Sequence, residues 1–195
     1  MSVRFMIDTD DLSKLTGHVE LLATYSDLVP QPAELRKEFP NSTLVLIDRG
    51  LGDPSGEASV FDIEPGALTI QQALAAFDDA RQRGVRYLTV YHDRDIAPEV
   101  AAAFKDRHPY NWDATLDGTA FIRGYDPLHS PAVVQCLSSI ELGYHADGNL
   151  VYEDAWHPRA PVNKLPGLHR DLEGAITKAV DLTADLRGMA ALLGG

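Results

Sequence analysis

Two acidic side chains stand two residues apart at the end of an apolar segment, where residues 58–66 read ASVFDIEPG. Side chains alternate between the two faces of a strand, so Asp62 and Glu64 point to the same side and share one site. Carboxylates held this close raise each other's proton affinity, which is the property that an acid catalyst needs. The alternative is that the strand ends in solvent, where acidic residues are common. The other strand ends decide between these two interpretations.

Polar side chains also end most of the other predicted strands. Each has a structural explanation when taken alone, because a strand-end Asp often caps a turn, an aromatic ring often packs in the core and a buried Gln often satisfies backbone groups. In a barrel of parallel strands, however, the carboxyl ends meet on one face, where such folds place their chemistry. The series favours a shared site made of Asp8, Asp48, Asp62, Glu64, Tyr91, His92, Asp93, Trp112, Asp113 and Gln135.

The elements that would position these side chains alternate along the chain. Apolar or β-branched runs predict strands at residues 3–8, 21–26, 43–48, 59–64, 87–92, 111–114, 119–122 and 132–137. Helical patterns lie at residues 31–39, 69–83 and 96–106, the second between a Thr69 cap and Gly84. This alternation predicts an α/β fold with parallel crossovers, either a barrel or a doubly wound sheet.

Two observations favour a small or incomplete (β/α) barrel of the TIM type. No glycine-rich phosphate loop follows any strand, which removes the usual reason to choose the nucleotide-binding sheet. The chain has 195 residues, fewer than the roughly 200 that such barrels normally need, so loops must replace some of the helices.

Composition excludes several classes of partner. The chain has 17 basic and 29 acidic residues, and its net charge of -12 repels phosphate backbones and anionic lipid heads. We therefore expect neither nucleic acid nor a membrane as a partner. The single cysteine, Cys136, excludes an internal disulfide and a cysteine-based zinc cluster, and we predict no metal and no cofactor. The start of the chain lacks a signal-peptide pattern, so we expect synthesis in the cytoplasm without one.

The motifs, taken in order, resemble a known family. A strand-one Asp, ATYSD, a DxE, YHDR, WDA and a late VVQ occur here in the order found in the glycoside hydrolase family 25 lysozymes and in the glycosidase-like barrel domains of actinobacteria and their phages. By this resemblance Glu64 matches the general acid, Asp62 the neighbouring carboxylate and Asp8 a further acid of the site. Tyr91, Trp112, Gln135 and Asp48 then match positions for binding the substrate, a cell-wall carbohydrate.

The resemblance implies glycoside cleavage, which needs one carboxylic acid to protonate the leaving oxygen and a second carboxylate to stabilise or attack the developing oxocarbenium ion. Asp62 and Glu64 supply both groups, and the faces of Tyr91 and Trp112 would pack against sugar rings.

Two features depart from the family pattern. The family carries another acid near its last strand, and this chain offers either Asp147 or the uncharged Asn149 in that region. Arg49 follows the third strand, and an ion pair from Arg49 to Asp62 or Glu64 would hold that acid ionised and disable it as a proton donor.

The end of the chain has its own pattern. After a barrel over residues 1–156 and a linker over residues 157–167, a C-terminal helix over residues 168–195 carries apolar residues in steps of four and three. This spacing suits pairing with a second copy or with another virion protein. Gly174, Gly188 and the small Ala175 and Ala179 weaken such a seam and favour packing on the barrel instead.

Two functions remain open. The first is a muramidase-type hydrolase of cell-wall glycan, of phage origin. The second is a structural virion protein, such as a minor tail component, that uses a glycosidase-like barrel to bind wall carbohydrate or as a scaffold. Either would act at the cell wall or in a virion. The intact DxE favours the first, whereas the acidic net charge weighs against a free enzyme attacking an anionic wall.

Overall fold

The computed structural model describes residues 3–15, 19–29, 31–115, 132–138 and 146–152. Compactness divides the chain into Met1–Ala160 and Pro161–Gly195, and every described residue belongs to the first unit. The predicted strand at 119–122, the linker at 157–167 and the C-terminal helix at 168–195 lie outside the described residues.

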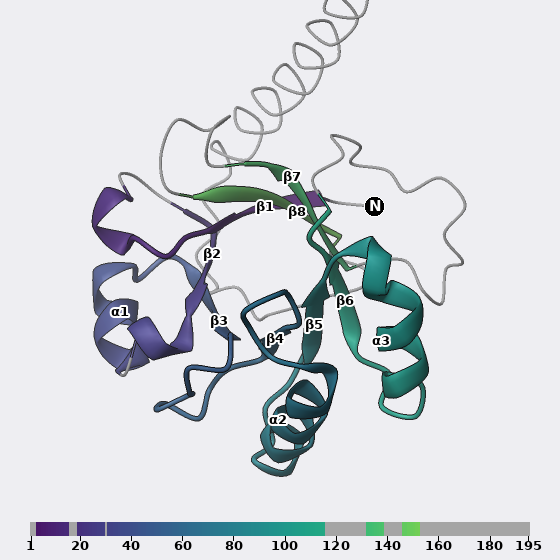
Figure 1. The fold of residues 1–195 in the computed structure, drawn as a ribbon. Helices are drawn as coiled ribbons and strands as arrows, with labels where there is room; N and C mark the ends of the chain where they lie inside the picture. The colour runs from purple at the N-terminus through teal and green to yellow at the C-terminus, as the bar shows by residue number, and fades with distance from the viewer. Residues whose placement is uncertain (1–2, 16–18, 30, 116–131, 139–145, 153–195) are drawn as a thin grey trace, which may run out of the picture. The chain divides into compact units, whose positions relative to one another are not determined.

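Eight strands form a closed barrel in the order of the chain, which confirms the predicted α/β barrel and shows that its wall is complete (Figure 1). The strands are β1 (Val3–Asp8), β2 (Leu21–Tyr25), β3 (Thr43–Asp48), β4 (Val60–Asp62), β5 (Thr89–His92), β6 (Tyr110–Asp113), β7 (Val133–Leu137) and β8 (Asp147–Tyr152). Neighbouring strands from β1 to β7 pair in parallel, as the alternation of strands and helices predicts.

The eighth strand was not among the predicted strands, and it runs antiparallel to both β7 and β1. The connection from β7 to β8 covers only residues 138–146, too short for the crossover that two parallel strands require. β8 opens with Asp147, Gly148 and Asn149, residue types that are depleted in strands, so the sequence pattern does not mark it.

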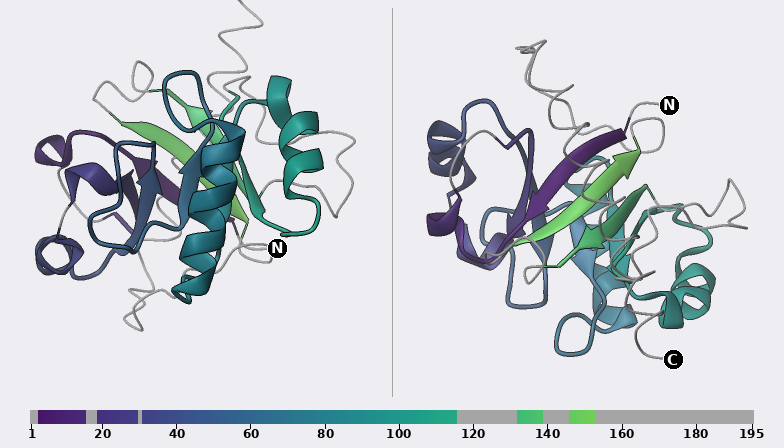
Figure 2. Two further views of the ribbon diagram at one scale, coloured as in Figure 1. Left: turned by 60° about the horizontal axis from the view of Figure 1, so that its bottom comes forward. Right: turned by 90° about the horizontal axis from the view of Figure 1, so that it is seen from above.

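The helices lie outside the ring of strands (Figures 1 and 2). They are α1 (Pro32–Glu38), α2 (Ile70–Gln82) and α3 (Ala97–Phe104), with short 3-10 turns η1 (Leu12–Lys14), η2 (Ser26–Leu28) and η3 (Arg94–Ile96). α2 begins at a capping box in which Thr69 accepts from the Gln72 amide and Gln72 accepts from the Thr69 amide. The connection from β3 to β4 has no helix, as the short chain requires.

Apolar side chains fill both sides of the strands. Inside the barrel, Met6, Ala23, Ile47, Val60 and Trp112 belong to one buried cluster. Outside it, a second cluster joins β4 and β5 to α2 and α3, and a third packs α1 against β3. Because both faces are covered, the bodies of β2 to β5 are largely apolar, and only the structure reveals which residues point inward.

Candidate functional site

The predicted acids lie on the inner face of the barrel at its carboxyl end. Asp8 follows the inward Met6 by two residues and Asp62 follows the inward Val60 by two, so both acids point inside. Their exposed fractions are only 6% and 4%. Glu64 comes two residues after Asp62, just beyond the end of β4. The structure therefore brings together the three residues that the sequence suggested as catalytic.

A fourth acid comes from β8. Asp147 pairs directly with Asp8 across the antiparallel β1 and β8 strands, and its charge raises the pKa of both Asp8 and Glu64. Asn149, the other candidate for this position, is fully buried and accepts a hydrogen bond of 2.9 Å from the Trp112 indole. Of the two residues, Asp147 is thus the one that acts on the other acids, and we refer to Asp8, Asp62, Glu64 and Asp147 as the inner acid cluster.

The two acids of the DIE motif differ in their proton affinity. Burial raises the pKa of Asp62 to about 6, against the opposing effects of a 3.0 Å hydrogen bond from the Glu64 amide and of the Arg49 charge. Burial, followed by the charges of Asp62, Asp93 and Asp147, raises the pKa of Glu64 to about 7. The higher pKa means that Glu64 keeps its proton to a higher pH than Asp62 does.

Burial and the neighbouring acids also raise the pKa of Asp8 and of Tyr25. Burial raises the pKa of Asp8 well above its usual range, and the charges of Asp147, Asp62 and Glu64 raise it further. Tyr25 ends β2 and packs against the inner core, and burial followed by the charges of Asp8 and Asp62 raises the pKa of its phenol. Burial and mutual repulsion thus raise the proton affinity of Asp8, Asp62 and Glu64 alike.

Polar and aromatic side chains from β5, β6 and β7 complete the inner layer. The Tyr91 hydroxyl donates to Gln135 Oε1 over 2.9 Å, and the Tyr91 ring meets Trp112 edge to face with centroids 5.1 Å apart. Tyr91, Trp112 and Gln135 are 6%, 0% and 4% exposed. These three predicted substrate-binding residues therefore gather beside the acids, but the Trp112 ring is enclosed by the core and has no open face for a sugar.

Asp48 lies apart from the other predicted site residues. It follows the outward Leu46 by two residues, so it points away from the barrel interior. Its side chain accepts a hydrogen bond from the Gly50 amide and lines an outer hollow of about 460 Å³ between the β3–β4 loop and α2. The structure does not bring Asp48 together with the inner acid cluster.

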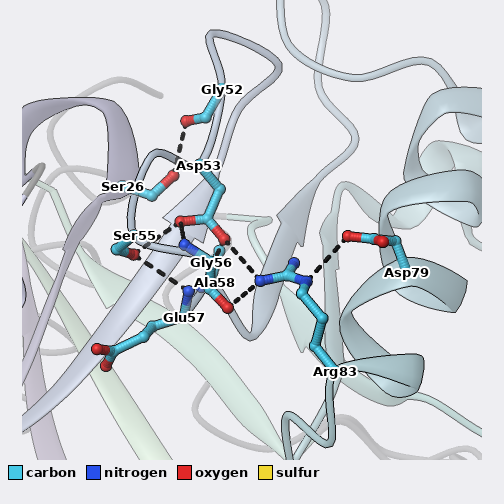
Figure 3. Close-up of polar contacts among 9 residues, drawn as sticks. All are labelled: Ser26, Gly52, Asp53, Ser55, Gly56, Glu57, Ala58, Asp79 and Arg83. Carbon is cyan, nitrogen blue, oxygen red and sulfur yellow. Dashed lines mark hydrogen bonds and ion pairs between the residues drawn. The ribbon is translucent and has the colours of Figure 1, made fainter.

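A second group of charges lies beside this hollow (Figure 3). Asp53 accepts hydrogen bonds from the Ser55 hydroxyl and from the Gly56 and Ala58 amides at 2.8–3.0 Å. Arg83 lies between Asp53 and Asp79, and it also donates to the Gly56 carbonyl. We refer to Asp53, Asp79 and Arg83 as the loop cluster, because together they fix the β3–β4 loop against α2.

Arg49 does not form the ion pair that would disable the acids. Its Nε and one terminal nitrogen donate to the two carboxylate oxygens of Asp27 at 3.0 and 2.7 Å. The guanidinium also lies 4.3 Å from the centroid of the Tyr25 ring. The ion pair from Arg49 to Asp62 or Glu64, which the sequence left possible, is thus replaced by one to Asp27 of η2.

Sequence reasoning did not select Tyr25 as a site residue. Two signals point to it: it stands two residues after the inward Ala23, and it belongs to the ATYSD motif.

Among residues 3–15, 19–29, 31–115, 132–138 and 146–152, no group of three His, Cys, Asp or Glu side chains is placed to hold a metal ion. In the same part of the chain, no helix is sufficiently long and apolar to cross a membrane.

The fold places this chain among proteins with a TIM-like barrel, eight-stranded and mostly parallel with helices on the outside. Comparison with family models, with curated proteins and with solved structures found no match.

Proposed function

We propose that the protein is a glycoside hydrolase of the muramidase type that cleaves bacterial cell-wall glycan. The observation that carries the proposal is the convergence of Asp8, Asp62, Glu64 and Asp147 inside the carboxyl end of a closed barrel. Parallel barrels carry their active sites at this end. Glycoside cleavage needs two carboxyl groups in opposite protonation states.

In the proposed reaction Glu64 is the general acid. It gives its proton to the glycosidic oxygen as the bond from that oxygen to the anomeric carbon breaks, and the leaving sugar departs as an alcohol. Ionised Asp62 stabilises the positive charge that develops on the sugar ring, an interaction that is strongest in the transition state. Water then adds to the anomeric carbon, and its proton returns to the carboxylate of Glu64.

The buried layer of Tyr91, Trp112 and Gln135 has a supporting role in this proposal. Tyr91 pairs with Asp62 in the β4–β5 register, and its hydrogen bond to Gln135 fixes its ring next to that acid. Rigid neighbours hold a catalytic carboxylate in one orientation, which lowers the cost of reaching the transition state.

A second function is favoured by the net charge of -12, which opposes free diffusion to an anionic wall. A protein held at the wall by a larger assembly does not meet this barrier. In that case the chain is a structural part of a phage virion that binds wall carbohydrate through the barrel without cleaving it.

The test is release of reducing ends from purified actinobacterial peptidoglycan at pH 6–7. Glu64→Gln keeps the shape of the side chain but removes its proton, so turnover should fall by at least about a hundredfold. Asp62→Asn should lower turnover as well, because it removes the stabilising charge. Glu57→Gln is the matched control, since Glu57 is exposed on the β3–β4 loop and pairs with Arg36.

Sedimentation of the protein with the same wall material, run in parallel, separates the two functions. Cleavage that Glu64→Gln abolishes and Glu57→Gln leaves intact supports the hydrolase. A wild type that sediments with the wall but releases no more reducing ends than Glu64→Gln refutes the hydrolase and supports the binding protein. A wild type that neither binds nor cleaves refutes both.

A further inference from the structure

Arg49 is the first residue after β3, the strand that pairs with the β4 strand of Asp62 at the carboxyl end of the barrel. In the parallel β3–β4 pair Asp48 lies opposite Phe61, and Arg49 and Asp62 are the residues that directly follow these two. Asp48 points outward, and alternation directs Arg49 toward the inner side that Asp62 shares. Its ring contact with Tyr25, which packs against the inner core, agrees with this direction.

The guanidinium of Arg49 is fixed in place by two elements. The two hydrogen bonds to Asp27 use one edge of the guanidinium in the fork geometry of a bidentate pair. The Tyr25 ring supports its flat face at 4.3 Å. Its side chain is 27% exposed, so solvent screens its charge only in part. A fixed, partly buried cation is therefore held close enough for its charge to act on Asp62 of the DIE pair.

We propose that Arg49 is a positioning residue that keeps Asp62 as the ionised member of the pair and thereby leaves the catalytic proton on Glu64. The inference rests on the proposed function for its catalytic meaning. Its electrostatic part is the effect of the Arg49 charge on the pKa of Asp62, and this effect is tested separately.

The charges around the pair support this role. Arg49 lowers the pKa of Asp62, whereas the charges that act on Glu64 are all acidic and raise its pKa. Among the largest causes of the pKa shifts of Asp8, Asp62 and Glu64, the basic side chain that appears is Arg49, at Asp62. The charged and titratable groups around Asp62 are Asp8 and Asp147 from β1 and β8, Tyr25 from β2, Asp48 and Arg49 from the end of β3, Glu64 beyond β4, and Tyr91 and Asp93 at β5.

The first test is a pH titration of the carboxyl carbons of Asp and Glu by NMR, with Asp62→Asn used to assign the Asp62 signal. In Arg49→Met the midpoint of Asp62 should rise by about one pH unit, because an opposite charge nearby is lost. Arg49→Lys keeps the charge and should restore most of the wild-type midpoint. An unchanged Asp62 midpoint in Arg49→Met would overturn the proposal.

Asp27→Asn provides the matched control for a merely structural effect. Arg49→Met removes both hydrogen bonds of the pair and Asp27→Asn removes one of them, but Asp27→Asn removes a negative charge instead of a positive one. The midpoint of Asp62 should therefore hold or fall in Asp27→Asn. A rise of equal size in both variants would show that loop distortion causes the change, and the proposal would be wrong.

The second test is the pH profile of kcat/KM on peptidoglycan. The acidic limb follows ionisation of Asp62, so it should move to higher pH by the same amount in Arg49→Met and return in Arg49→Lys. If wild type does not cleave but Asp62 still shifts in the NMR titration, the proposed hydrolase fails while the effect of Arg49 on Asp62 stands. If the protein cleaves and neither midpoint nor acidic limb moves, the hydrolase stands and the role of Arg49 is refuted.

Discussion

The inner acid cluster and the loop cluster contain the same kind of side chain in opposite circumstances. In the loop cluster Asp53 accepts three hydrogen bonds from Ser55, Gly56 and Ala58 and faces a guanidinium (Figure 3). In the inner acid cluster Asp62 accepts a single amide hydrogen bond and stands among other acids. The first arrangement stabilises the negative charge of a carboxylate, and the second destabilises it.

This difference teaches how to separate a structural carboxylate from a reactive one within a single chain. A carboxylate whose oxygens are satisfied by backbone amides stabilises the loop around it. A buried carboxylate with too few partners costs stability and has a raised pKa, as Asp62 and Glu64 do, and such perturbed acids are typical of reactive sites. We therefore expect Asp→Asn to lower the free energy of unfolding at Asp53 and to raise it at Asp62.

The largest effect is expected at the loop cluster. Asp53→Asn replaces an acceptor oxygen with an NH₂ group and removes the charge that faces Arg83, so several donors lose their partner. The free energy of unfolding should fall by about 2–3 kcal/mol, measured by urea denaturation at pH 7. If Asp53→Asn is as stable as wild type, these hydrogen bonds do not hold the loop and the comparison breaks.

The second effect is a gain of stability at the inner acid cluster. The folded-state pKa of Asp62, about 6, exceeds its unfolded value near 3.8, so its contribution to stability is fully present below about pH 4 and is lost as the pH rises through 6. Asp62→Asn escapes this loss and retains an acceptor oxygen for the Glu64 amide. It should be more stable than wild type by about 1–2 kcal/mol at pH 8 and equally stable at pH 4.

The same urea series at pH 4 and pH 8, applied to Glu64→Gln, checks this result at the neighbouring acid. Its pKa of about 7 places the loss of stability at a slightly higher pH than for Asp62. A variant that is less stable than wild type at pH 8 would mean that the inner acids stabilise the fold, against the comparison.

Much of the fold could be predicted from the sequence because its signals are local. The apolar runs predicted β1 and β3 at their observed bounds, and the Thr69 cap and Gly84 predicted the limits of α2 to within a residue. β8 was missed because its strand opens with polar residues and pairs with β1 and β7 through contacts distant in sequence.

The candidate site could be predicted only where the alternation of side chains along a strand has a known reference residue. Asp62 and Glu64 share a face whatever the fold, so their meeting followed from spacing alone. Asp48 was grouped with them because β3 is apolar on both faces, and the pattern does not reveal that its last residue points outward. The partner of Arg49 could not be predicted either, since Asp27 comes from another connection at the barrel's carboxyl end.

The smallest effect separates the two halves of the loop cluster. Arg83 is the C-cap of α2, and its Nε donates to Asp79 over 2.9 Å, with side-chain exposures of 36% and 67%. Its distance to Asp53 is 3.7 Å, and Asp53 itself is held by the backbone amides of its own loop. Exposed ion pairs contribute little, because water already solvates both charges and ordering two long side chains costs entropy.

Arg83→Met keeps most of the apolar stem while removing the charge, so the free energy of unfolding should fall by only about 0.5–1 kcal/mol. Urea denaturation of Asp53→Asn, Arg83→Met and the double variant measures how far the two residues act together. If Asp53 stabilises the loop through its amides, the double variant should lose nearly the sum of the two single losses. A loss above 2 kcal/mol for Arg83→Met alone, or a double variant no worse than Asp53→Asn, would instead make the guanidinium the residue that satisfies Asp53. The difference between the two clusters would then depend on whether a cation pairs with the acid. Arg49 would act on Asp62 in the way that Arg83 acts on Asp53.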